Sequence, residues 1–154
     1  MGRERPWLFA LFLLALVSFH FALRPLWVSW PVAPDLLVCA LLLAARALRV
    51  GAASALGFAL GLLEDAFAVT HFGTGALVFT AAAALGSWSR DVFLGDEPLF
   101  IAAYLFAGKW VVDLAVLLLS GGFSWWAAFV IGPGDALVTS AVGAILAAAA
   151  RVPR

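Results

Sequence analysis

Long apolar runs, broken at short intervals by charges, glycines and prolines, make up most of this chain. Six segments stand out, at about residues 7–23, 31–48, 51–69, 72–88, 99–119 and 133–150. Each has, or nearly has, the roughly 20 helical residues needed to cross the hydrocarbon core of a bilayer. The pattern predicts an all-α, polytopic membrane protein, a bundle of six transmembrane helices that forms one domain over residues 1–154.

The second segment is the weakest of the six, because its charge-free part covers only residues 36–45. A helix of that length extends over about 15 Å, roughly half of a hydrocarbon core. The segment can span if Arg46 reaches the headgroups and residues 31–34 complete the other end.

The positions of the arginines decide between five and six spans. With six spans and the N-terminus in the cytoplasm, Arg24 alone is external. Without the second span, all the arginines from Arg46 onward would move outside, against the positive-inside rule. We therefore expect six spans with both termini in the cytoplasm. The arginines then expected in the cytoplasm are Arg3, Arg5, Arg46, Arg49, Arg90, Arg151 and Arg154.

Composition agrees with a membrane protein. Hydrophobic residues make up 66% of the chain and charged residues 12%, and the mean hydropathy is +1.10. Soluble domains average about 45–50% apolar and about 25% charged residues. The formal net charge of zero argues against electrostatic binding of nucleic acid.

The connection over residues 120–132 is expected on the external side. Its stretch 123–129 is too apolar for a free loop and is expected to lie in the membrane interface or against the bundle. The sequence Gly132-Pro133-Gly134-Asp135 then predicts the start of the last helix, with Pro133 near its first position. Tryptophans flank the predicted spans as interfacial belts require, except Trp110, which falls in mid-span.

Ionisable residues inside spans are costly and mark candidate functional sites. Here five carboxyl groups concentrate in the outer half of the predicted bundle, with Lys109 and Arg24 as the available cations. Two readings stay open: a structural polar network, or a cation, proton or ligand site. The residues of this predicted intramembrane polar network are Asp35, Glu64, Asp65, Lys109, Asp113 and Asp135.

The third segment carries small residues at every fourth position, which lets helix backbones approach closely. The line formed by Ala53, Gly57 and Gly61 continues to Asp65, so this acid is expected in the packed seam, protonated or paired with Lys109 or backbone donors. The seam serves either packing within the bundle or the binding of a partner's transmembrane helix.

No constellation for catalysis or metal binding is visible. His20 and His71 are far apart in the predicted topology, and Cys39 lies alone in an apolar run. The sequence shows no metal-ligand spacing, phosphate loop or nucleophile with a partnered base. We expect neither enzymatic activity nor a cofactor.

Two stretches give the chain a family resemblance. Pro34-Asp35-Leu36-Leu37 opens the second segment. The third reads Gly57-Phe58-Ala59-Leu60-Gly61-Leu62-Leu63-Glu64-Asp65 and is followed by Phe72-Gly73-Thr74-Gly75-Ala76-Leu77. This pattern resembles MreD, the family of rod-shape-determining integral membrane proteins. Glu64 departs from it, since an apolar residue is commoner there.

The resemblance implies a non-enzymatic scaffold of the cell-elongation machinery in the bacterial cytoplasmic (inner) membrane. Its partners would be an MreC-like membrane protein and, through it, MreB filaments, RodA and a class B penicillin-binding protein; self-association stays open. It also implies a fold similar to the substrate-binding subunits of energy-coupling-factor transporters. That similarity supplies the alternative function, a vitamin-binding transporter subunit. Such subunits usually carry an Ala-x-x-x-Ala pattern on the first helix, which Ala10, Ala15 and Ala22 do not form.

Overall fold

The computed structural model describes residues 6–27, 32–67, 72–89 and 97–150. Within these ranges the chain forms α-helices and one π-helical segment and no strand, which confirms the all-α prediction for this part of the chain. The elements are α1 (Pro6–Trp27), α2 (Leu36–Ala47), α3 (Val50–Phe67), α4 (Thr74–Ser89), α5 (Pro98–Leu119), η1 (Ala127–Ile131) and α6 (Gly132–Ala150).

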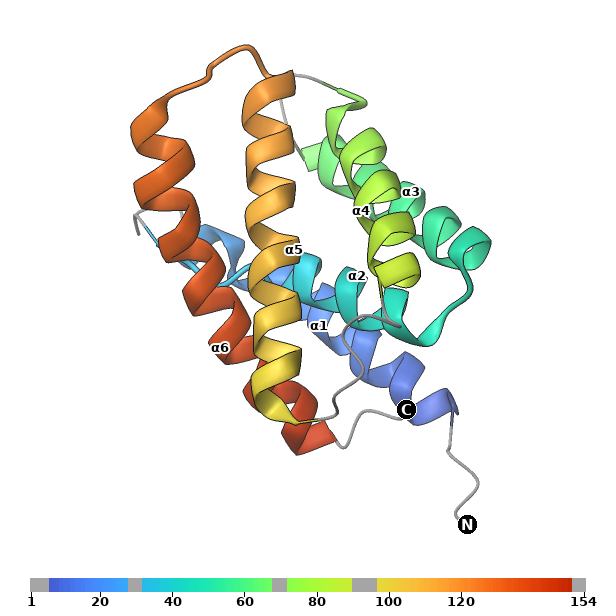
Figure 1. The fold of residues 1–154 in the computed structure, drawn as a ribbon. Coiled ribbons are helices and arrows are strands. Elements are labelled where there is room, and N and C mark those ends of the chain that lie inside the picture. The colour runs from blue at the N-terminus through green and yellow to red at the C-terminus, as the bar shows by residue number, and fades with distance from the viewer. Residues whose placement is uncertain (1–5, 28–31, 68–71, 90–96, 151–154) are drawn as a thin grey trace.

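Helix α2 is the centre of the fold. It contacts each of the other five α-helices, and every residue from Leu36 to Ala45 is buried. The most extensive packing joins α3 to α4 and α5 to α6, and Figure 1 shows these two pairs on either side of the view with α2 behind and between them. The apolar run that made the second segment a candidate span is therefore the protein's core.

Within the described residues, four helices are long and apolar enough to cross a membrane. They are Trp7–Leu26, Val50–Phe67, Pro98–Leu119 and Ala127–Ala149, within α1, α3, α5 and the combined η1–α6. Helix α2, with 12 residues, and α4, with 16, are shorter than the roughly 20 residues of a full span. The structure thus shows a multi-pass candidate, and the count of six spans stays a prediction.

Helix α2 is shorter than the predicted span 31–48, because it starts only at Leu36. Asp35 is its N-cap and accepts a hydrogen bond from the Val38 N–H (3.1 Å), which fixes the start of the helix. The preceding residues are held by α6 instead: the N–H of Ala33 donates to Asp135 Oδ1 at 3.2 Å. The expectation that residues 31–34 complete the helix is wrong for 32–34, and residue 31 lies outside the described ranges.

Helix α6 begins at Gly132, where the sequence predicts a helix start, but it continues a helical stretch that already begins at residue 125. Residues 125–150 are continuously helical, with π geometry at Ala127–Ile131. Pro133 lacks an N–H and normally ends a helix. Here the preceding turn widens, so that the Gly132 N–H donates to the carbonyl of Ala127, five residues back. The π turn carries the helix past the proline, which sequence reasoning took for a helix start.

Trp110 of α5 repairs the hydrogen bond that this turn loses. The Ala128 carbonyl would accept a hydrogen bond from the N–H of Gly132 in an α-helix, or from the N–H of residue 133 in a π-helix. Gly132 donates elsewhere and Pro133 has no N–H. The indole Nε1–H of Trp110 donates to this carbonyl at 3.0 Å, and the ring lies edge-on to Phe129. The mid-span position of Trp110 thus has a structural reason.

We expect Trp110→Phe to lower stability by about 1–3 kcal/mol, because it keeps the ring but leaves a buried carbonyl without a donor. In a Pro133→Ala background the restored N–H of residue 133 can donate to the Ala128 carbonyl, so Trp110→Phe should lower stability much less. Unfolding of the four proteins in detergent micelles, combined as a double-mutant cycle, measures this coupling. Equal losses in both backgrounds would contradict the assigned role of Trp110.

Candidate functional site

Six ionisable side chains are linked to one another at one end of the bundle. The last turns of α1 and α3, the second half of α5, and the starts of α2 and α6 all meet there. We call the side chains linked at this end the polar cluster: His20, Arg24, Asp35, Glu64, Lys109 and Asp113. Arg24 and His20 of α1 join four of the six residues that the sequence singled out.

Lys109 is the buried cation of the cluster, with 8% of its side chain exposed. Its Nζ lies 3.2 Å from Asp35 Oδ2 and donates to Asp113 Oδ1 on the next turn of α5 at 2.5 Å. Asp35 therefore does two things: one oxygen caps α2 and the other pairs with Lys109. A single positive charge is shared by two carboxylates.

Glu64 pairs with Arg24 rather than with Lys109. The guanidinium makes two contacts with its carboxylate, Nη2 to Oε1 at 3.0 Å and Nη1 to Oε2 at 3.2 Å. This fork geometry is the strong form of a carboxylate–arginine pair. The residue by which the chain departs from the MreD pattern therefore joins the end of α3 to the end of α1.

His20 lies between the two pairs. Its Nδ1 accepts a hydrogen bond from the Leu37 N–H at 3.3 Å, so the ring proton is assigned to Nε2, which lies 3.8 Å from Glu64 Oε2. The 3.5 Å approach of Nδ1 to Asp35 Oδ1 is then a contact between two acceptors rather than an ion pair. His20 is not among the predicted site residues, because nothing in the sequence indicates its place beside two carboxylates.

Asp65 lies apart from the cluster and caps another helix. Its Oδ1 accepts from the Gly75 N–H at 2.8 Å, and its Oδ2 accepts from the N–H groups of Gly73 and Ala76 at 3.0 and 2.9 Å. Gly73, at φ 97°, has no side chain with which to cap α4 itself. Asp65 supplies the missing cap from α3, and the carboxylate also faces the positive end of the α4 dipole. Of the partners expected for Asp65, the backbone donors are found and Lys109 is not.

The predicted seam residues Ala53, Gly57, Gly61 and Asp65 are the buried residues of α3, and they face α4. A methyl group on Gly57 would overlap the carbonyl oxygen of Phe79 and lie 2.9 Å from the Ala83 Cβ. One on Gly61 would overlap the Gly75 carbonyl oxygen and lie 2.6 Å from the Ala76 Cα. This face is therefore occupied inside the protein, and it offers no free surface to a partner helix.

Asp135 and Thr139 of α6 hold the segment before α2. Asp135 accepts from the Ala33 N–H, and one turn later the hydroxyl of Thr139 accepts from the Asp35 N–H at 3.0 Å. Thr139 is 1% exposed and was not anticipated, because a single threonine in an apolar helix carries no signal of its partner. Asp135 thus belongs to a backbone clamp and makes no ion pair with Lys109 among the interactions of the described residues.

Two cavities adjoin the polar cluster. The larger, about 400 Å³, is lined by the acids Asp35, Glu64, Asp65 and Asp113, by His20, and by an apolar wall that includes Phe79, Val112 and Val116. The smaller, about 100 Å³, lies between α5 and the π turn and is lined by Asp113 and Asp135. Asp113 borders both, and its Oδ2 is buried without a hydrogen-bond partner among the described residues.

No group of three or more His, Cys, Asp or Glu residues in the described ranges is arranged to hold a metal ion. Cys39 is buried in α2, where its thiol donates to the Thr139 carbonyl at 3.4 Å. Arg3, Arg5, Arg90, Arg151, Arg154 and His71, which the sequence argument also used, lie outside the described residues.

Comparisons of the chain with protein families, with curated proteins and with solved structures found no match.

Proposed function

We propose that the chain is a non-enzymatic membrane scaffold of the MreD type, acting in the cell-elongation complex of a bacterial cytoplasmic membrane. In this proposal it crosses the membrane six times, with both termini in the cytoplasm. It binds an MreC-like membrane protein and, through it, supports MreB filaments, RodA and a class B penicillin-binding protein. Peptidoglycan synthesis and cell shape depend on it indirectly.

The observation that carries the proposal is the role of the residues behind the resemblance. Asp35 caps the buried α2, Gly57 and Gly61 bring α3 against α4, and Asp65 caps α4. The pattern behind the resemblance therefore specifies a way of packing helices, as expected for a scaffold. Residues of an enzyme or carrier motif would instead be left free to meet a substrate.

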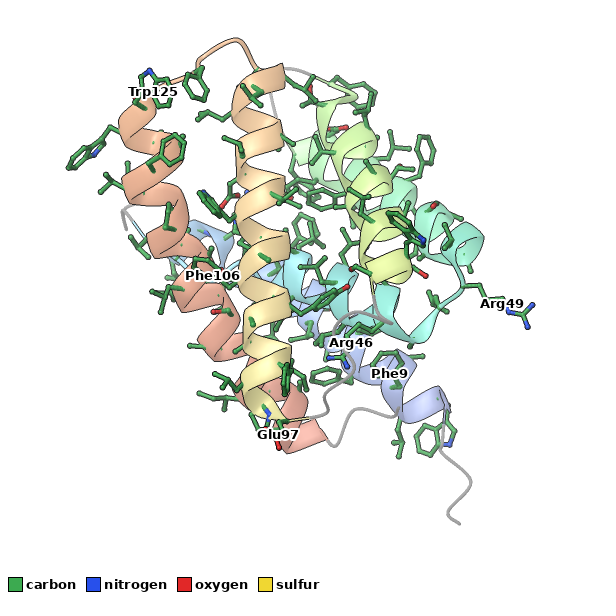
Figure 2. The ribbon with its side chains drawn as sticks, viewed as in Figure 1. Phe9, Arg46, Arg49, Glu97, Phe106 and Trp125 are labelled. Carbon is green, nitrogen blue, oxygen red and sulfur yellow. The ribbon has the colours of Figure 1, made fainter. Side chains whose placement is uncertain are left out.

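The positions of labelled side chains support the proposed topology. Figure 2 shows Glu97 at the lower end of the bundle and Trp125 at the opposite end, and Arg49 projects away from the helices. Arg46 lies over the ring of Tyr104, 5.6 Å from its centre. Arg46, Arg49 and Glu97 would lie on the cytoplasmic side, while the stacked Trp125 and Phe129 (5.4 Å) would lie at the outer interface.

The test is deletion of the gene together with copurification. We expect rounded or widened cells that require no particular vitamin, and we expect the tagged chain to bring down an MreC-like single-span protein from gently solubilised membranes. An Ala10→Leu variant, altered only on the exposed α1, is the matched control and should behave like the parent.

The alternative is a vitamin-binding subunit of an energy-coupling-factor transporter. The cavity of about 400 Å³ between the helices favours it. The first helix does not, because Ala10, Ala15 and Ala22 are never four residues apart. Rod-shaped mutant cells that fail only when a vitamin is scarce, with copurification of an ATPase pair, would replace the scaffold by the transporter subunit.

A further inference from the structure

The larger cavity differs from an ordinary packing defect in its size and lining. Genuine voids in protein interiors are apolar and small, whereas ligand pockets of about 300–1,000 Å³ combine apolar walls with a few polar groups. This cavity has about 400 Å³, an apolar wall on α4 and α5, and carboxylates contributed by the start of α2, by α3 and by α5. Its dimensions suit a small organic molecule.

The interactions of the lining side chains show which carboxylate lacks a cation. Asp65 has three backbone donors, and Glu64 has both contacts of the Arg24 fork. Lys109 must serve both Asp35 and Asp113. Asp65 has backbone donors in place of a cation, and of the two carboxylates around Lys109 one is left without a cation of its own.

Asp113 is where that charge is left unsatisfied. Its Oδ1 accepts a hydrogen bond from Lys109 Nζ, while its Oδ2 is buried with no donor among the described residues. The side chain is 27% exposed and borders the cavity. The terminal torsion of an aspartate is broad, so the carboxylate can turn Oδ2 toward a donor in the cavity while Lys109 keeps its bond.

We propose that this cavity binds a small organic molecule with a protonated primary or secondary amine and an apolar body, whose ammonium donates to Asp113. An anion would have to displace a carboxylate from Lys109 or Arg24, since both cations are already engaged with acids. A quaternary ammonium has no N–H to give to Oδ2. Phe79, Val112 and Val116 would contact the apolar body.

The inference does not rest on the scaffold proposal, and its test uses no cellular phenotype. The full chain, in lipid nanodiscs, is titrated with butylamine, phenethylamine and tryptamine. Each amine is compared with the alcohol of the same skeleton, namely butanol, 2-phenylethanol and tryptophol. The alcohols enter lipid at least as readily, so the difference isolates recognition of the ammonium.

Three variants locate the site. Asp113→Asn removes the charge and keeps the shape, and Val116→Phe fills the cavity and keeps every charge. Glu97→Gln changes an exposed acid at the far end of α5 and is the control. Circular dichroism first checks that each variant is as helical as the parent. Val116→Phe keeps the test valid if Asp113→Asn does not fold.

We expect at least one amine to bind the parent tenfold or more tightly than its alcohol. Binding should weaken at least tenfold in Asp113→Asn and in Val116→Phe, and should be unchanged in Glu97→Gln. Equal binding of amine and alcohol, absence of binding by all three amines, or binding that survives both cavity variants would overturn the proposal. It would also be overturned by an infrared band of a protonated carboxyl group that Asp113→Asn removes and no amine displaces, because a proton would then satisfy Asp113.

Discussion

Asp65→Leu is expected to destabilise the bundle more than any other single substitution of an ionisable residue. It leaves the N–H groups of Gly73, Gly75 and Ala76 without their acceptor at the start of α4. The donors of Gly75 and Ala76 are buried, and each unsatisfied buried donor costs about 1–3 kcal/mol, so the loss should be on the order of 2–6 kcal/mol. That is a large share of the roughly 5–15 kcal/mol by which proteins are stable.

Two neighbouring variants sharpen this prediction. Asp65→Asn should be intermediate, because an amide has one acceptor oxygen where the carboxylate uses two, and its NH₂ would face a donor. Glu64→Leu, one residue earlier, should cost far less, because Arg24 is 36% exposed and can reach the headgroups. Unfolding of the three proteins by titrated denaturing detergent ranks them. Equal losses for Glu64→Leu and Asp65→Leu would mean that the cap on α4 is unimportant.

Gly61→Ala should have the second large effect. The added methyl group would overlap the Gly75 carbonyl and force α3 and α4 apart along their most extensive contact. Overpacking of this kind costs about 1–3 kcal/mol, and displacement of Gly75 would also disturb its hydrogen bond to Asp65. We expect Gly57→Ala to behave alike, since its methyl group meets the Phe79 carbonyl.

The same helix supplies the control. Gly51 has nothing within 4 Å of the position of a Cβ, and alanine is the better helix former. Gly51→Ala should therefore be neutral or slightly stabilising in the same unfolding measurement. If all three alanine variants unfold alike, close approach of α3 to α4 is not what these glycines provide.

The sequence could predict the helical class and the seam because both follow from local periodicity. A small residue at every fourth position of α3 puts Gly57, Gly61 and Asp65 on one face whatever the helix packs against. It could not predict the partner of that face. Lys109 is expected at nearly the same depth in the membrane as Asp65, but it lies on α5 and pairs with the carboxylate of Asp35 instead. Pairing between helices depends on their arrangement around α2, which no local pattern encodes.

The two misplaced boundaries have a similar origin. The apolar pattern alone extends the second segment back to residue 31, but the side chain of Asp35 caps the helix so that it begins at Leu36. Pro133 predicts a helix start from the sequence alone, because proline is favoured at the first position of a helix. The π turn that accommodates Pro133 inside a continuous helix depends instead on a hydrogen bond from Trp110 of another helix. At Asp35 a local cap overrode the apolar pattern, and at Pro133 a tertiary hydrogen bond did so.

Helix α2 sets the order in which the protein can be assembled during synthesis. Its 12 residues cover about 18 Å, too little for a bilayer to hold it alone. In the proposed six-span arrangement, α2 is joined to α3 through Leu48 and Arg49, and the two would enter the membrane as a helical hairpin. Its buried surface is then covered piece by piece as α4, α5 and finally α6 leave the ribosome. Helix α2 is made second but is fully covered only when α6 has been added. Until then, the nascent chain would expose part of the surface of α2 to lipid.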